Sequence, residues 1–451
     1  YVLTIAVSIS SGADAILNFF PAALPYKLAI ILGVLLIMTV MNLRGVKESV
    51  TVLTPIFLVF LVTHAVLIFG AIGTHLGSAG QITREVADGS RSHLSTAGLV
   101  GVAIVFMRAF SLGGGTFTGI EAVSNGIAIM REPRVRTAKR TMFLMATSLA
   151  ITASGILLAY LLLHVTPERG KTMNGILAER FAGHGHVAMG FVIVTLFSEG
   201  ALLFVAAQAG FVDGPRVMSN MALDQWLPSR MAALSEQLTM RNGVYLMAAA
   251  AALVLLYSRG AVDALVVMYS INVFITFTLS NVAMVRHAKQ QHDSRAIFVH
   301  SLAAAVCAMI LIVTLVEKFT EGGWITTVIT AALVVLCFLI RNHYRIVGQK
   351  VVKLTRDLDL DLPPPAGITA PDELDPALPT AVVLPGGFGG LGLHPLLQIP
   401  RTFPDQFRQV VFVSVGVIDA GVFKGKEEID AMGAKLEHDL DRYVAFAKTH
   451  L

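Results

Sequence analysis

The chain is dominated by long apolar runs that are separated by polar segments. A helix needs about 20 apolar residues to cross the hydrocarbon core of a bilayer, which is about 30 Å thick. Such runs occupy residues 1–20, 28–42, 51–73, 96–130, 141–165, 187–212, 243–257, 261–285, 297–316 and 324–340. The sequence therefore predicts a polytopic α-helical membrane protein with a transmembrane domain of ten spans over residues 1–340.

The composition agrees with this class of protein. Hydrophobic residues make up 55% of the chain and charged residues only 14%, whereas a soluble domain usually carries about 25% charged residues. Cys307 and Cys337 both lie inside apolar runs, so we expect reduced thiols and no disulfide framework. The Cys and His spacing matches no zinc site, and soluble-enzyme chemistry is poorly supported. We therefore do not expect an enzyme.

The basic residues predict how the spans are oriented. "REPRVRTAKR" (Arg131 to Arg140) holds five Lys or Arg residues, and "LRGVKES", "RHAKQQHDSR" and "RNHYR" are also basic. All four segments fall on one side if ten spans alternate, and cytoplasmic loops attract Lys and Arg. We expect that side to be the cytoplasm, with the protein in the plasma membrane.

The character of the chain changes at about Arg341. Residues 341–379 are rich in Pro and acidic residues, which predicts an extended cytosolic linker. In residues 380–451, "TAVVLP" and "QVVFVSVGVI" are predicted strands, with a loop and some helix between them. The final segment is predicted to be a helix whose apolar face holds Ile429, Met432, Leu436, Leu440 and Val444. Strands alternating with helices predict a partial α/β domain with a parallel sheet, placed in the cytosol as a regulatory domain.

The run at 96–130 is too long for one straight crossing, and it contains "FSLGGGTFTGIEAVSNG". Each Gly costs roughly 0.8–1 kcal/mol in a helix interior relative to Ala, so Gly113, Gly114 and Gly115 favour local unwinding. Unwound backbone at membrane depth survives only inside protein or beside a wet cavity. Secondary transporters build midplane sites from such broken helices. The alternative is that these small residues only allow close helix packing.

Several polar side chains are candidates for the same site. The hydroxyls of Thr116 and Thr118, together with freed carbonyls, would suit a dehydrated monovalent cation, although Thr can also bond to its preceding helical turn. Glu121 is an intramembrane carboxylate that either exchanges protons or pins the half-helix. Glu199 lies mid-span without an obvious local partner and is a second candidate for proton coupling. The partner of Arg108, just before the break, cannot be identified from sequence.

The quoted motifs resemble those of a known superfamily. "GGGTFTGIEAVSN" followed by "MREPRVRTAKR" resembles the sixth helix, and the basic loop after it, of amino acid–polyamine–organocation (APC) transporters. "NLRGVKES" and "GFVDGPRVMSNMALDQWLP" are similar to two other loops of that superfamily. The resemblance is greatest to a branch of proton-driven potassium importers with twelve helices and a cytosolic domain similar to universal stress proteins.

The resemblance implies a LeuT/APC-type inverted-repeat fold that lacks its first two helices, so we expect an N-terminal part to be missing. It places Thr4 and Ser8, one turn apart on one helix face, opposite the break, and it places Tyr269 at the same pocket. The residues expected to bind the ion or substrate are Thr4, Ser8, Gly113, Gly114, Gly115, Thr116, Thr118 and Tyr269. Proton coupling is expected at Glu121 or Glu199.

Three functions remain open at this point. The first is proton-coupled potassium uptake, the second is a proton-coupled amino acid permease, and the third is a membrane sensor that signals through the tail. The expected partners are the bilayer and a small ion or small-molecule substrate, with a homodimer left open and no nucleic acid. Transport should need no cofactor. The tail sequence "GGFGGLG" is not placed between a strand and a helix with a phosphate-binding lysine. Its glycines could still bind an anion, so a bound nucleotide is retained as a hypothesis.

Overall fold

The computed structural model describes residues 1–45, 50–113, 123, 127, 130–168, 170–236, 239–358, 375–417 and 426–450. Their contacts divide the chain into two compact units. The first unit comprises Tyr1–Val217 and Arg241–Leu333, and the second comprises Met218–Met240 and Val334–Leu451.

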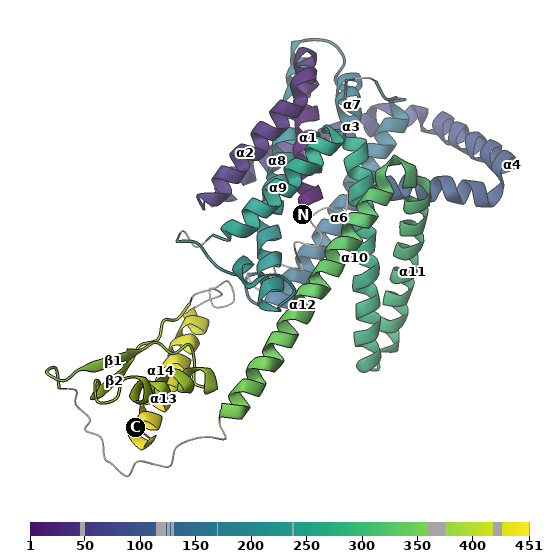
Figure 1. Ribbon diagram of the computed structural model, residues 1–451. Coiled ribbons are helices and arrows are strands. Elements are labelled where there is room, and N and C mark those ends of the chain that lie inside the picture. Colours follow the sequence, from purple (N-terminus) through teal and green to yellow (C-terminus); the bar gives the residue numbers. More distant parts are fainter. Residues whose placement is uncertain are drawn as a thin grey trace. The chain divides into compact units, whose positions relative to one another are not determined.

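The first unit is built from helices (Figure 1). They are α1 (Val2–Leu17), α2 (Lys27–Leu43), α3 (Val50–His75), α4 (Ala79–Leu112), α6 (Arg134–Leu162), α7 (Met173–Ala182), α8 (His186–Leu223), α9 (Arg241–Ser258), α10 (Val262–Gln290), α11 (Ser294–Glu317) and the first part of α12 (Trp324–Leu358). The last residues of α8 and most of α12 belong to the second unit. Short helical turns occupy Pro21–Tyr26, Leu76–Ser78, Ser229–Met231 and Phe319–Gly323. Figure 1 shows α10 and α11 side by side, in agreement with their contacts.

The helices follow the apolar runs of the sequence. Within the described residues, nine helices are long and apolar enough to cross a membrane, and each corresponds to a predicted run. The remaining run, residues 1–20, forms α1, an apolar helix of 16 residues. That length is slightly below the usual range of about 17–25 residues for a crossing.

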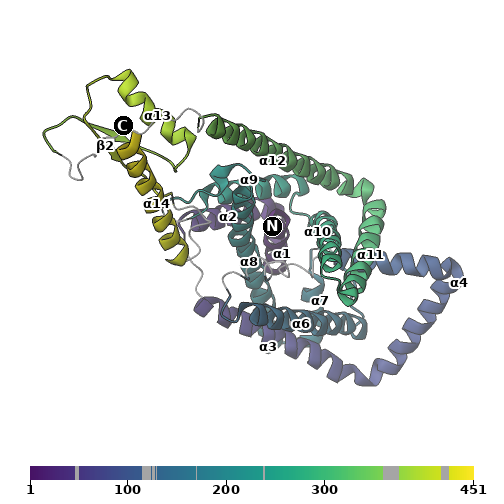
Figure 2. The ribbon, with the colours of Figure 1, turned by 90° about the horizontal axis from the view of Figure 1, so that it is seen from below.

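Residues 79–95 differ from the prediction of a polar loop, because they form the first part of α4. The segment contains strong helix formers such as Ala, Gln, Arg and Glu, and Gln81 donates a hydrogen bond of 2.9 Å to Glu85 one turn later. The backbone leaves helical geometry at Gly98, where φ is 67°. Figure 2 shows α4 as two straight pieces that meet at an angle.

The predicted linker also begins later than Arg341. α12 continues as helix to Leu358, so the first part of the segment 341–379 is helical. The reason is that residues 341–358 contain no proline, and their Arg, Lys and Leu residues are good helix formers. Residues 359–374, which contain the proline run, lie outside the described residues.

α1 is largely buried inside the first unit, and its Ile5 and Ile9 side chains have no exposed surface. It contacts α2, α9 and α10, and Figure 2 shows these helices and α8 around it. Glycines allow its close approach to α8. A Cβ added to Gly200 would lie 3.0 Å from the Ile16 side chain and 3.1 Å from the Gly12 carbonyl oxygen. Small residues serve this purpose widely in membrane proteins.

We expect Gly200→Val to destabilise the packing of α1 on α8 by about 1–3 kcal/mol, the usual cost of overpacking. The measurement is the thermal unfolding midpoint of the detergent-solubilised full-length protein. Gly190→Val is the matched control, because it lies in the same helix and has no atom within 4 Å of its added Cβ. Equal midpoints for the two variants would contradict the proposed contact.

The second unit contains a small parallel sheet. β1 (Thr380–Val383) pairs with β2 (Gln409–Phe412) in parallel, with Thr380 opposite Gln409. α13 (Gly390–Thr402) connects the strands, and α14 (Lys426–His450) follows. The core consists of Val383, Leu393, Leu396, Tyr443 and Phe446. The predicted strands and final helix are confirmed, although strand pairing in "QVVFVSVGVI" ends at Phe412.

Candidate functional site

Two candidate hydroxyls lie on α1, as the sequence predicted. Thr4 is 5% exposed and Ser8 is 4% exposed, so both side chains are buried in protein. Within the described residues, the Thr4 hydroxyl has no hydrogen-bond partner. A buried hydroxyl left unsatisfied costs about 1–3 kcal/mol, so this oxygen is available to a ligand.

α10 contributes buried hydroxyls and contacts α1. Tyr269, a predicted site residue, is 4% exposed. Its neighbour Ser270 is completely buried, and its hydroxyl has no partner in the described part of the chain. Ser10 on α1 is in the same situation. Ser270 and Ser10 could not be identified from the sequence, because serine is common in apolar helices and its spacing carries no distinguishing signal.

The glycine break itself is only partly described. α4 ends at Leu112, and Gly113 has no atom within 4 Å of the position that a Cβ would take. Gly114, Gly115, Thr116, Thr118 and Glu121 lie outside the described residues. Their predicted position opposite Thr4 and Ser8 therefore stays a prediction.

Arg108 has a partner that sequence could not supply. Its guanidinium lies 3.3 Å from a carboxylate oxygen of Glu317, so an ion pair joins α4 to α11. α4 and α11 also contact each other. The pair explains how a basic side chain is accommodated near the end of α4, where an unpaired Arg would be costly.

Glu199 on α8 joins three helices through hydrogen bonds. Its Oε1 accepts a bond of 2.9 Å from the side-chain amide of Asn174 on α7. The Asn174 carbonyl oxygen accepts a bond from the Tyr160 hydroxyl on α6. The Oε2 atom of Glu199 is buried and has no partner within the described residues. The sequence offers no local partner for Glu199, and the structure supplies one that is close in space but 25 residues away in sequence.

Two further polar contacts hold α2 in place. Lys27 forms an ion pair of 2.7 Å with Asp14, which joins α2 to α1. Asn42 and Gln208 exchange two amide hydrogen bonds of 2.8 and 3.0 Å, which join α2 to α8. Each group therefore has a partner, and these contacts support the helices that carry the candidate site.

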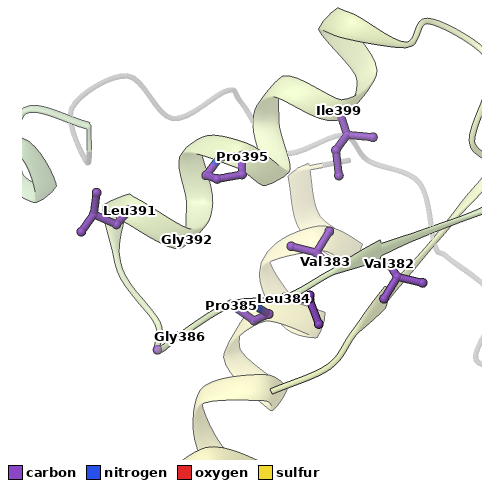
Figure 3. Close-up of a pocket in the computed structure, with 10 residues that line it drawn as sticks. Val382, Val383, Leu384, Pro385, Gly386, Leu391, Gly392, Pro395 and Ile399 are labelled. Carbon is purple, nitrogen blue, oxygen red and sulfur yellow. The ribbon is translucent and has the colours of Figure 1, made fainter. Parts of the chain in front are cut away.

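The tail contains a cavity of about 460 Å³ (Figure 3). It is lined by the end of β1, the following glycine loop and one side of α13, with Val383, Gly386, Leu391 and Ile399 among its residues. The sequence interpretation of "GGFGGLG" is corrected in one respect, because this segment does connect a strand to a helix. Ligands of α/β folds usually bind at the carboxyl ends of such strands.

Tyr443 on α14 fixes the glycine loop. Its hydroxyl donates a hydrogen bond of 2.6 Å to the Gly387 carbonyl oxygen, and its ring stacks on Phe412 with 5.4 Å between centroids. A Cβ at Gly392 would lie only 1.7 Å from the Tyr443 hydroxyl. The start of α13 therefore accepts no side chain at this position.

We expect Gly392→Ala to loosen the tail by about 1–3 kcal/mol, because the new methyl group overlaps the Tyr443 hydroxyl. The measurement is the rate of limited proteolysis of the tail in the full-length protein, which should rise roughly fivefold or more. Gly433→Ala is the control, since it is also helical and has open space around its Cβ. Equal cleavage rates would contradict the contact.

Comparisons with known proteins agree on one family. The family model described as amino acid permease matches residues 1–340. The chain is also 32% identical over 357 residues to "Potassium transporter KimA" of Bacillus subtilis (strain 168). That match covers 78% of this chain and 57% of the relative, so the chain spans somewhat over half of the relative's length.

Proposed function

We propose that this chain, which belongs to the amino acid permease family, is a secondary active transporter that imports potassium together with protons. The observation that carries the proposal is the contact between α1 and α10, which hold buried hydroxyls at Thr4 and Ser270 without partners in the described residues. The printed function of the relative, a potassium transporter, supports the choice of ion.

The chemistry of the site fits a monovalent cation. A dehydrated potassium ion requires several neutral oxygen ligands in place of its water shell. We propose that Thr4, Ser8 and Tyr269 supply some of these oxygens. Thr116, Thr118 and the carbonyls of residues 113–115 would supply the others from the broken helix. Binding would then satisfy the buried Thr4 hydroxyl, which has no partner within the described residues.

Proton coupling is assigned to the intramembrane carboxyls Glu121 and Glu199. A carboxyl group inside a membrane domain is costly when ionised, so it tends to bind a proton or a cation. In this proposal protons enter with the ion, and the protein lies in the plasma membrane with its tail in the cytoplasm.

An amino acid substrate is the principal alternative, because it is the description of the family itself. In that case the amides of the glycine break and the helix dipole would bind the substrate carboxylate. A sensor that signals through the tail is a second alternative, favoured by the cavity beside the glycine loop. We also propose, as further alternatives, that the cavity binds a nucleotide and that the protein forms a homodimer.

We expect Thr118→Val to lower rubidium or potassium uptake by roughly tenfold or more, because the ion loses one oxygen ligand worth over 1 kcal/mol. Uptake is measured with the full-length protein in cells that lack other potassium importers. Thr74→Val is the control, since the hydrogen bonds described for the Thr74 hydroxyl stay within α3, at the Gly70 and Ala71 carbonyls and the His75 ring. Normal uptake by Thr118→Val would remove this hydroxyl from the mechanism.

We expect Glu121→Gln to make uptake independent of external pH if Glu121 carries the coupling proton, because an amide does not titrate in this range. The measurement is rubidium uptake as a function of external pH at constant membrane potential. An unchanged pH profile would leave Glu121 with a structural role and assign coupling to another group.

A further inference from the structure

Glu199 occupies an unusual position for a carboxylic acid. Tyr160 on α6 and the neighbouring residues of α7 and α8 pack around an apolar cluster, which comprises Leu67, Ala71, Ala159, Leu177, Ala178, Val192 and Leu196. Glu199 follows Leu196 of this cluster by one turn of α8, and within the described residues its carboxyl group receives one hydrogen bond, from the Asn174 amide. A single neutral donor offsets only a small part of the cost of burying a negative charge.

The direction of the amide determines which carboxyl oxygen can carry a proton. The Tyr160 hydroxyl donates to Asn174 Oδ1, so the amide nitrogen of Asn174 faces Glu199 and donates to Oε1. In a neutral carboxyl group the carbonyl oxygen is the stronger acceptor, so the oxygen that accepts from this amide is best assigned as the carbonyl oxygen. The remaining oxygen, Oε2, is buried and has no partner in the described part of the chain. It is the position where a proton would reside.

Several charged groups on the surrounding helices pair with one another, while Arg136, Lys139 and Arg140 lie in the first two turns of α6, at the end opposite to Tyr160. On α1 and α2, Asp14 pairs with Lys27. Lys171, just before α7, pairs with Glu179 on α7. Arg180, also on α7, lies 3.9 Å from Glu168. It also donates to two carbonyl oxygens that directly follow α6. Further along α8 itself, Arg216 pairs with Asp213.

α3, which contacts α6 and α7, carries the titratable side chains His64 and His75. His64 is buried; its Nδ1 lies 3.0 Å from the Phe60 carbonyl oxygen, while its Nε2 has no partner within the described residues. His75 bonds to the Ala71 carbonyl. No ion pair within the described residues involves Glu199. Nothing described near the carboxyl group therefore stabilises its ionised form by charge.

We propose that Glu199 is a proton-binding site, with Asn174 and Tyr160 as its positioning residues. This inference rests on the proposed function and specifies its proton site. A proton from the aqueous phase forms an O–H bond at Oε2, and the carboxyl charge changes from −1 to neutral. Asn174 continues to donate to Oε1, so the neutral acid keeps α6, α7 and α8 connected.

Proton release would change the contact between α7 and α8. The carboxylate then has two oxygens that require donors, and Asn174 satisfies only one of them. Water must reach Oε2, so the segment around Asn174 must separate from α8. α7 lies between the ends of α6 and α8, on the side predicted to face outward because the basic segment 131–140 precedes α6. Protonation at Glu199 would thus favour closure of this outer side.

The direct test is infrared difference spectroscopy of the full-length protein in lipid at neutral pH. Wild type should show a carbonyl-stretching band of a protonated carboxylic acid that Glu199→Gln lacks. Glu179→Gln is the matched control, because Glu179 lies on α7 as a partly exposed carboxylate in an ion pair, and it should retain the band. A band that persists unchanged in Glu199→Gln, or an absent band in wild type, overturns the proton site.

The positioning role has a separate readout. Asn174→Leu removes the one donor to Glu199 Oε1 within the described residues, so the Glu199 band should move to higher frequency, and Tyr160→Phe should move it less. A residue with only a structural role in α7 would leave the band frequency unchanged, and that result overturns the positioning role.

The link to transport is tested by rubidium uptake over a range of pH. Glu199→Gln should lose the pH dependence that Glu179→Gln retains, and an unaltered profile in Glu199→Gln overturns the coupling role. If wild type shows the band but transports no rubidium, the proposed substrate is wrong while the proton site stands. The two failures can therefore be distinguished.

Discussion

The apolar interior of a membrane domain offers no water to a polar group, so every buried oxygen must be satisfied by protein or by a bound solute. This constraint gives meaning to the few oxygens that lack a partner in the described residues. Thr4, Ser10 and Ser270 present hydroxyls of this kind on α1 and α10, and Glu199 presents a carboxyl oxygen on α8. Other polar groups nearby are paired, such as the side-chain amides of Asn42 and Gln208. The unsatisfied oxygens are therefore the best candidates for ligand and proton sites.

Close packing determines where these oxygens lie. Gly12 and Gly200 allow α1 to approach α8 with almost no space for a side chain between them, and the Asp14–Lys27 ion pair joins α1 to α2. α1 is thus held by several neighbours, which fixes the direction of its hydroxyls. A cation site requires such rigidity, since neutral ligand oxygens must keep their geometry when water is removed.

The positions of the helices could be predicted because bilayer thickness imposes a length and a composition on each crossing. The α/β alternation of the tail could be predicted for a similar reason, since strands and helices differ in period. The helical segment at 79–95 could not, because an exposed polar helix lacks the apolar periodicity that identifies a helix. The link between Tyr160, Asn174 and Glu199 also leaves no trace in sequence spacing. Likewise, Ser270 gains its significance only from complete burial.

The central claim is that buried hydroxyls of α1 and α10 help to bind a dehydrated potassium ion. Ligand-dependent thermal stability tests this claim most directly. A ligand that binds only the folded state raises the unfolding midpoint as its concentration increases. The full-length protein should be stabilised by potassium chloride more than by sodium chloride at equal ionic strength, and Thr4→Val should reduce the difference. The account is contradicted if potassium and sodium act equally while an amino acid raises the midpoint.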